Sequence, residues 1–235
     1  MLNFFNWIFP RKDSKDERDY MFLTRPENGI QIPVAEDLHV LPFVNQGDLG
    51  SCVGCAGAHI MSHYFGKRMS ALWLYYQCEQ IDNHPEQGTD IRCALKVLKE
   101  KGICLEDSWP YSDKWPLDKP GASLDEEASK YRIGSYYRAT TLKQVVRAVS
   151  ARLPVFATIK IFSGWFNGKT TVDDSGFPLG IHAIAYSACD IPRGRFIITN
   201  SWGDRWKSAG RAYVPFEYFK KYKVDNWVPV IERKE

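Results

Sequence analysis

The apolar positions divide the chain into a helical half followed by a strand-rich half. From residue 50 to residue 102, apolar side chains recur at intervals of three and four, which is the period of an α-helix packed against a core. Helices are predicted over residues 51–66, 69–80 and 90–101. Ser51 is the expected N-cap of the first helix, and Gly102 is expected to end the third.

The second half carries shorter apolar runs that are rich in β-branched residues or alternate with polar ones. Strands are predicted over residues 154–161, 181–188, 195–200 and 211–214, and a helix packed on the sheet over residues 141–153. Because helices come first and strands follow, the predicted fold class is α+β, with a helical lobe and a β-rich lobe. A site fed by both halves would lie in the cleft between them.

Composition is that of an ordinary globular protein and excludes few functions. The 235 residues are 44% hydrophobic and 25% charged, and the net charge is +3, which gives no electrostatic case for a nucleic acid partner. No apolar run is long enough for a transmembrane helix, and no signal peptide is recognised, so a cytoplasmic location is predicted. The sequence does not specify an oligomeric state.

Residues 1–25 are expected to form a tail or a short pro-segment ahead of the main domain. Residues 2–9 are apolar and aromatic, but no basic region precedes them and no small-residue cleavage site follows. Residues 11–19 carry both charge signs, as a solvated tether would. The alternatives for residues 2–9 are a docked or unstructured segment, a weak membrane-surface contact, and an inhibitory segment in or near the cleft.

The cysteines are scattered, and their spacing suggests buried free thiols rather than a disulfide scaffold. They lie at positions 52, 55, 78, 93, 104 and 189. Cys52 and Cys55 form a CxxC, but no second CxxC or HxxxH pair completes a zinc site, so no metal is predicted. Thiol oxidoreductases place such a CxxC in a βαβ pattern, which is not visible before Cys52. Cys55 is therefore expected to be a small core residue, with a resolving or regulatory thiol as the alternative.

The segment before Cys52 has the features of a reactive thiol site. Gly47 and Gly50 let the backbone turn tightly before the helix begins. Cys52 then stands at the helix N-terminus, where unpaired N–H groups and the helix dipole favour thiolate over thiol. A lone Cys in an apolar helix is more often an inert buried thiol. Two motifs further along the chain nevertheless favour a reactive thiol at Cys52.

The two motifs supply a base and a partner for that base. His182 stands near the start of an apolar strand, and Asn200 ends another strand just before Trp202 and Gly203. An amide oxygen that binds one imidazole nitrogen fixes the ring, so that the other nitrogen can face the sulfur. A Trp beside the pair would exclude water. Each motif alone could be a strand followed by a turn, but together they indicate a hydrolytic Cys–His dyad.

These motifs resemble those of the papain family of cysteine peptidases, which carry Q-G-x-C-G-S-C, then H-A, then N-S-W-G. The matching residues are Gln46, Gly47, Gly50, Ser51, Cys52, His182, Ala183, Asn200, Ser201, Trp202 and Gly203. Residues 94–111 resemble the family's helix and Y-P-Y turn, and the similarity runs over residues 31–219. The chain is most similar to compact microbial or viral members. The peptidase domain would span residues 26–235, with the helical lobe over about 26–120 and the β-rich lobe over about 121–235.

The resemblance implies a papain-like two-lobed fold and a peptidase that needs no metal or organic cofactor. Cys52 would attack the carbonyl of a peptide or protein substrate, and His182 would protonate the leaving amine. The side chain of Gln46 and the backbone N–H of Cys52 would form the oxyanion hole. Asn200 would orient His182, and Trp202 would shield their contact.

Departures from the family pattern concern the surroundings of these residues. Leu49 replaces the first Cys of the family motif, so the family's disulfide at that place cannot form, which agrees with a reducing compartment. The Gly-Gly pair that binds the substrate backbone aligns with Gly88 and Thr89. An apolar pocket is expected for the substrate residue two before the scissile bond. The predicted substrate-binding residues are Gly88, Thr89, Ile91, Thr158, Ile181, Ala183 and Trp202.

Two other functions remain open on the same residues. A related thiol amidase or isopeptidase would use the same dyad, because the dyad sets the chemistry and the cleft sets the substrate. A catalytically silent papain-like binding module is disfavoured because Cys52, His182, Asn200 and Gln46 are all present.

Overall fold

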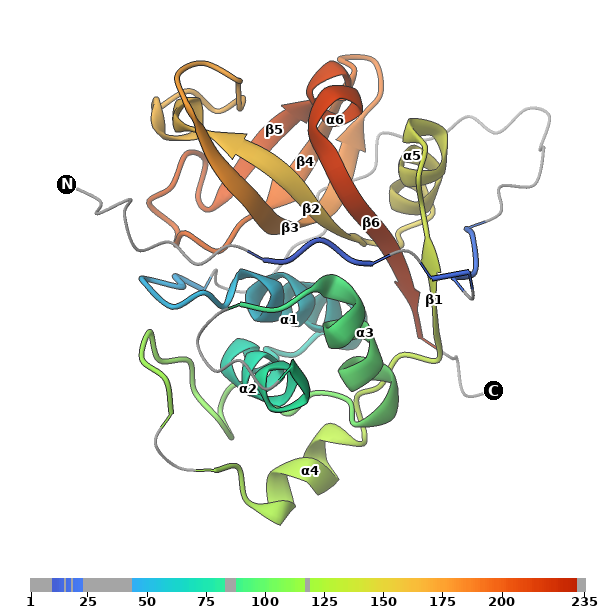
Figure 1. The fold of residues 1–235 in the computed structure, drawn as a ribbon, viewed down its shortest axis with the longest axis vertical. Helices are drawn as coiled ribbons and strands as arrows, with labels where there is room; N and C mark the ends of the chain where they lie inside the picture. The colour runs from blue at the N-terminus through green and yellow to red at the C-terminus, as the bar shows by residue number, and fades with distance from the viewer. Residues whose placement is uncertain are drawn as a thin grey trace.

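The structure, a computed structural model, describes residues 10–14, 16–17, 19–22, 44–82, 88–116 and 119–231. The helices of the first half of the chain gather in one lobe, the strands and the helices between them form the other, and the described part of the N-terminal segment runs between the two lobes (Figure 1). The predicted α+β class with a helical and a β-rich lobe is confirmed. Residues 2–9, for which three interpretations were open, lie outside the described residues.

The helical lobe confirms the three predicted helices to within two residues at each end. It contains α1 (Cys52–Phe65), α2 (Ala71–Asp82), α3 (Ile91–Glu100) and the unpredicted α4 (Ala122–Ala128). Helix α1 ends because Gly66 adopts a left-handed φ of 64°. Ser51 stands at the N-cap position, as predicted, but its side chain makes no cap hydrogen bond, and its hydroxyl instead bonds Tyr111.

The β-rich lobe is built on a six-stranded antiparallel sheet in the order β1-β6-β2-β3-β4-β5. The strands are β1 (Ser135–Arg138), β2 (Val155–Phe162), β3 (Pro178–Asp190), β4 (Arg195–Thr199), β5 (Arg211–Pro215) and β6 (Lys223–Val230). The helices that pack on it are α5 (Leu142–Ser150) and α6 (Phe216–Tyr222). The four predicted strands and α5 are confirmed, whereas β1, β6 and α6 were not predicted.

The sheet register brings distant motifs to one place. Ala185 of β3 pairs with Thr199 at the end of β4, and the rings of Trp202 and His182, which lie just beyond this pair, stack on each other. An isolated bridge pairs Asn45 with the same Trp202, which draws the segment before α1 to this edge of the sheet. The N-terminus of α1 and the start of β3 therefore meet between the lobes.

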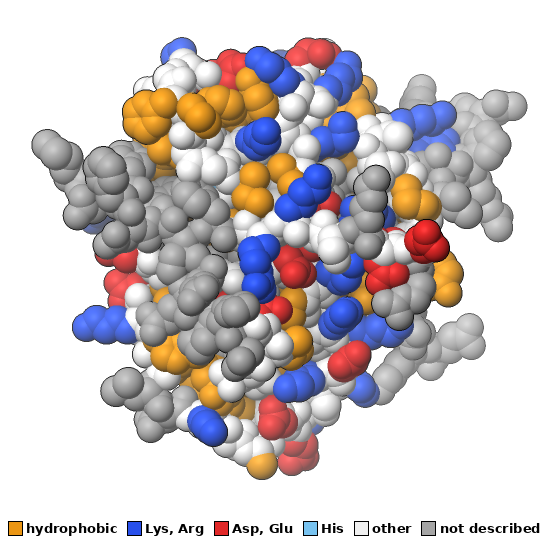
Figure 2. All heavy atoms as spheres, in the orientation of Figure 1, with side chains coloured by type: hydrophobic (Ala, Val, Ile, Leu, Met, Phe, Trp, Pro, Cys, Tyr) orange, Lys and Arg blue, Asp and Glu red, His pale blue; other side chains and the backbone are white. Residues whose placement is uncertain are grey.

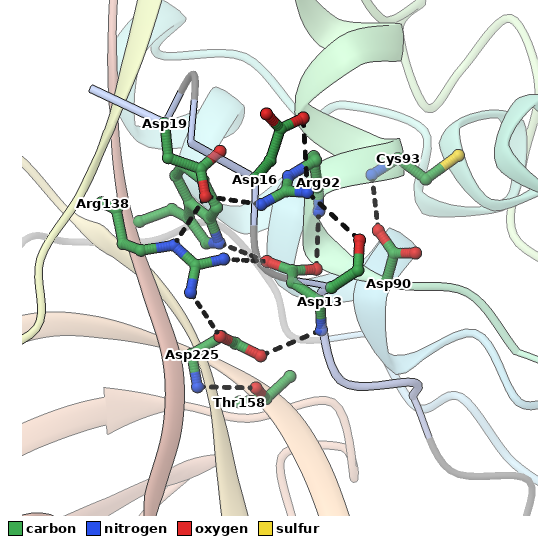
Figure 3. Close-up of polar contacts among 11 residues, drawn as sticks. Asp13, Asp16, Asp19, Asp90, Arg92, Cys93, Arg138, Thr158 and Asp225 are labelled. Atoms are coloured by element: carbon green, nitrogen blue, oxygen red, sulfur yellow. Dashed lines mark hydrogen bonds and ion pairs between the residues drawn. The ribbon is translucent and has the colours of Figure 1, made fainter. Parts of the chain in front are cut away.

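The described part of the N-terminal segment is fastened to both lobes by a buried polar cluster around Asp13 (Figure 3). The carboxylate of Asp13 accepts from the backbone N–H of Arg92 in α3 at 3.2 Å and from Nε1 of Trp227 in β6 at 2.5 Å. Its backbone N–H donates to Asp225 of β6 at 3.1 Å, and Arg138 of β1 lies 3.6 Å from its carboxylate. The segment thus contacts the first turn of α3 and two neighbouring strands.

On the face shown in Figure 2, Lys and Arg side chains are interspersed with Asp and Glu, and neither sign gathers into one large patch. In the part of the chain that the structure describes, no helix is both long enough and apolar enough to cross a membrane.

Candidate active site

Cys52 is the first residue of α1 and is buried, with 1% of the residue exposed. The preceding loop turns at Gly47, whose φ is 58° and where a Cβ would lie 2.8 Å from Cβ of Asp113, so a glycine is required there. Burial raises the pKa of the Cys52 thiol to about 12, and a hydrogen bond from the backbone of Ala183 offsets part of that rise. The backbone of the residue that follows His182 is thus close enough to lower the pKa of the thiol.

The imidazole of His182 is contacted by Asn200 at one ring nitrogen and by Trp202 on one ring face. Its Nε2 lies 2.7 Å from Oδ1 of Asn200, and because an amide oxygen only accepts, Nε2 carries the proton and Nδ1 is the acceptor in the neutral ring. The ring of Trp202 stacks on it, with centroids 4.6 Å apart and planes at 24°. Burial lowers the pKa of His182 to about 4, and the bond to Asn200 acts in the opposite direction.

A chain of hydrogen bonds connects His182 to Gln46 by way of Ser201. Oδ1 of Asn200 accepts from the backbone N–H of Ser201 at 2.8 Å, as well as from His182. The hydroxyl of Ser201 donates to Oε1 of Gln46 at 2.5 Å, and the backbone N–H of Gln46 donates to the carbonyl of Ser201 at 2.8 Å. The structure thus brings together three predicted site residues from separate motifs.

The side-chain amide of Gln46 is oriented by bonds at both of its atoms. Ser201 donates to Oε1, and Nε2 donates to the carbonyl oxygen of Leu49 at 3.1 Å. Because an amide NH₂ has two hydrogens, one remains available after the bond to Leu49. Gln46 is 7% exposed, so its hydrogen bonds form largely out of water.

Gly88 and Thr89, the predicted shelf for the substrate backbone, lie beside the N-terminal segment. The backbone N–H of Arg11 donates to the carbonyl oxygen of Thr89 at 3.2 Å. The hydroxyl of Thr89 donates to Asp82 at 2.5 Å, and Asp82 also pairs with the guanidinium of Arg11 at 2.5 Å. In this structure the carbonyl of the shelf therefore has a partner from the same chain.

The other predicted substrate-binding residues differ in their exposure. Ile91 and Ala183 are buried in the same core cluster as Cys52, and Ile181 is partly exposed. Thr158 is 1% exposed and its hydroxyl accepts from the backbone N–H of Asp225 at 3.2 Å. The apolar pocket that these residues would form stays a prediction.

Two further residues, to which no role was assigned from the sequence, form hydrogen bonds with the candidate site residues. Ser201 connects Asn200 to Gln46, and the hydroxyl of Tyr111 lies 3.0 Å from the carbonyl oxygen of Gln46. Ser201 belongs to the N-S-W-G motif, and Tyr111 ends the segment that resembles the family's Y-P-Y turn. Their partners depend on how the lobes meet, which no local pattern specifies.

The six cysteines are all free and buried, as their spacing predicted. Among the described residues, no group of three or more His, Cys, Asp or Glu side chains is placed to hold a metal ion.

Solved structures share this architecture over nearly the whole chain. Xylellain, a cysteine protease from Xylella fastidiosa, superposes with a TM-score of 0.85 over 97% of both chains, at 24% identity. Procathepsin B from Trypanosoma congolense gives a TM-score of 0.72 over 95% of this chain and 87% of its own, at 16% identity. At such identities these likenesses establish the fold alone.

Sequence comparison establishes the family. An uncharacterized peptidase C1-like protein of Acanthamoeba polyphaga mimivirus is 27% identical over 203 residues, which cover 76% of this chain and 65% of the relative. The chain thus spans slightly less than two thirds of that relative's length. The model of the papain family of cysteine proteases matches residues 33–226. The chain belongs to the papain family of cysteine proteases.

Proposed function

We propose that the protein is a cysteine peptidase in which Cys52 is the nucleophile and His182 is its base. The observation that supports this most is the 2.7 Å contact between Nε2 of His182 and Oδ1 of Asn200, which leaves Nδ1 to accept the thiol proton. Burial disfavours a lone charge on either group, as the pKa directions of both residues indicate. Proton transfer creates two opposite charges, and in a buried site each then stabilises the other.

The proposed reaction proceeds through an acyl-enzyme. The thiolate of Cys52 forms a bond to the peptide carbonyl carbon, and the carbonyl electron pair moves to its oxygen. The C–N bond then breaks as the imidazolium of His182 gives its proton to the leaving amine. Water, deprotonated by the neutral imidazole, hydrolyses the thioester and regenerates the thiol.

The oxyanion formed in this reaction needs donors that are fixed in advance. The backbone N–H of Cys52 at the start of α1 is one donor, and the second hydrogen of the Gln46 amide is the other. The bonds from Ser201 and to Leu49 support this role, because they hold the amide in one orientation before substrate arrives. Removing one such donor typically costs a factor of about 10²–10³ in kcat.

Cleavage assays separate this function from its alternatives. The full chain is incubated with a peptide library, an amide or isopeptide library, and no substrate, beside the variants Cys52→Ala and Cys55→Ala. Peptide cleavage that is lost in Cys52→Ala and retained in Cys55→Ala is the expected result. Cleavage of side-chain amides alone would favour the amidase or isopeptidase, and no cleavage by the folded chain would favour the binding module.

We further propose that residues 26–235 form the peptidase domain. We also propose that the N-terminal segment lowers its peptidase activity by occupying part of the substrate-binding site. The support is the bond from the backbone of Arg11 to the carbonyl of Thr89, since the family resemblance assigns that shelf to the substrate backbone. A substrate would then compete with the segment for the same acceptor. The Asp13 cluster holds the segment in place from both lobes.

A further inference from the structure

Tyr111 reaches the loop that precedes the nucleophile from the helical lobe. Its backbone N–H donates to Oε1 of Glu106 at 2.8 Å, which anchors the segment that carries it. Its hydroxyl lies 3.0 Å from the carbonyl oxygen of Gln46 and 2.6 Å from Oγ of Ser51. One phenol therefore contacts the loop near its beginning and at its end, immediately before Cys52.

The chemistry of these groups fixes the direction of each hydrogen bond. The carbonyl of Gln46 can only accept, so the phenol of Tyr111 uses its single hydrogen there. Ser51 must then donate to the phenol oxygen, which leaves its own oxygen to accept from the thiol of Cys55, 3.6 Å away. Burial raises the pKa of Tyr111 well above its ordinary value, so the phenol keeps its proton.

Gln46 is consequently held from both lobes. From the β-rich lobe, Ser201 binds its backbone N–H and its side-chain oxygen. From the helical lobe, Tyr111 binds its backbone carbonyl. The neighbouring Gly47 packs so closely on Asp113 that a Cβ there would meet it at 2.8 Å, so the same helical-lobe segment also limits the loop sterically.

We propose that Tyr111 is a positioning residue for the oxyanion hole. Its hydroxyl holds the Gln46 peptide and, through Ser51, the first turn of α1, so that the Gln46 amide and the N–H of Cys52 face one point. The inference rests on the proposed function, because Tyr111 acts through Gln46. Its loss leaves His182 in place, since that ring is held by Asn200 and Trp202 in the β-rich lobe.

The variant Tyr111→Phe removes the hydroxyl and keeps the ring. We expect kcat on a fluorogenic peptide to fall about tenfold, less than loss of a whole oxyanion donor, with KM changed by less than about twofold. Alkylation of Cys52 by iodoacetamide forms no oxyanion, so its rate and pH profile are expected to match those of the wild type. Tyr64→Phe is the matched control, because the Tyr64 hydroxyl donates to the carbonyl of Pro229 at 2.5 Å, away from the loop.

A double-mutant cycle separates positioning from a general loss of packing. In the Gln46→Ala background, Tyr111→Phe is expected to cause a smaller fall in kcat than in the wild type, because only the N–H of Cys52 then remains to be positioned. The inference is overturned by an unchanged kcat in Tyr111→Phe, by a parallel fall in the alkylation rate, or by an equal loss in the Gln46→Ala background. Should Tyr111→Phe not fold, Ser51→Ala replaces it, because it removes the donor to the phenol, and the same pattern is expected.

Failure of the proposed function has a different signature. A wild-type chain that cleaves no peptide and whose Cys52 reacts with iodoacetamide no faster than free cysteine contradicts the dyad itself. A wild type that is active and alkylated rapidly, with kcat unaffected by Tyr111→Phe, contradicts only the positioning role.

Discussion

The ring of Trp202 lies stacked on the imidazole of His182, with centroids 4.6 Å apart. It covers the ring whose Nε2 binds Asn200, so it keeps water from that hydrogen bond. We expect Trp202→Ala to lower kcat/KM about tenfold, equivalent to about 1.4 kcal/mol of transition-state stabilisation. Trp202→Phe retains an aromatic ring and is expected to lose less. Equal activity of Trp202→Ala and the wild type on a fluorogenic peptide would show that the stacking has no catalytic effect.

Deletion of residues 1–18 is expected to raise peptidase activity. The deletion removes the N–H of Arg11 from the carbonyl of Thr89 and the ion pair of Arg11 with Asp82. Initial rates of the deleted and full chains on one peptide measure the effect. Arg11→Ala is the graded comparison, because it removes the ion pair and keeps the backbone bond, and an intermediate rate is expected.

The deletion also removes Asp13 and its contacts with Arg138 and with the backbone of Arg92, so folding must be followed alongside activity. Circular dichroism and thermal unfolding of each chain provide that control. Unchanged activity in a deleted chain that remains folded would contradict the inhibitory role. The segment would then have a structural role only.

Asp13 is expected to make stability depend on pH. Burial, with the nearby charges of Asp225 and Asp90, raises the pKa of Asp13 to about 7. In the unfolded chain an Asp titrates near pH 3.9, so between about pH 4 and 7 the folded chain holds a proton that the unfolded chain has released. The contribution of Asp13 to the free energy of unfolding is thus present at pH 4 and is lost as the pH rises through 7, by an amount on the order of a few kcal/mol.

Urea unfolding at several pH values between 4 and 7 checks this linkage. Asp13→Asn cannot titrate, so its stability is expected to fall less steeply over this window than that of the wild type. Asp173→Asn is the control, because the hydroxyl of Ser175 and other donors lower the pKa of Asp173 to about 2, below the window. Equal slopes for the wild type and Asp13→Asn would contradict the prediction.

A substitution in the capping box of α5 is expected to lower stability without affecting catalysis. The hydroxyl of Thr141 accepts from the backbone N–H of Gln144 at 3.2 Å, and the Gln144 side chain accepts from the backbone N–H of Thr141 at 3.0 Å. Thr141→Ala is expected to lower the free energy of unfolding by about 1 kcal/mol with an unchanged kcat. Thr140→Ala retains the box and is expected to change stability less, as measured by urea unfolding.

Local patterns were sufficient to predict most of the long elements and to select candidate site residues. The apolar periodicity of α1 and α3 and the β-branched runs of β2 and β3 predict their type because these segments face the core along their whole length. The site residues stand at the ends of such elements, where glycines and polar side chains interrupt apolar runs. His182 and Asn200 were identified in this way and lie in contact.

Features that depend on tertiary contacts could not be predicted locally. Strand β6 was missed because Asp225 and Asn226, adjacent polar residues, are both buried in it, which breaks the expected alternation. Asp225 is tolerated there because it binds the backbone of Asp13 and the guanidinium of Arg138, residues far away in sequence. The hydrogen bond of Ser51 likewise depends on a distant residue, since its hydroxyl, although at the N-cap position, binds the phenol of Tyr111.

The most direct test of the proposed dyad is the pH profile of Cys52 alkylation by iodoacetamide, with the modified residue located by mass spectrometry. An isolated thiol has a pKa near 8.5, and the burial of Cys52 moves it further upward unless His182 supplies a proton acceptor. With the proposed dyad, we expect rapid alkylation of Cys52 that already reaches a plateau below neutral pH in the wild type and is lost in His182→Ala. Alkylation of Cys52 that rises only above about pH 8.5, equally in the wild type and in His182→Ala, would contradict it.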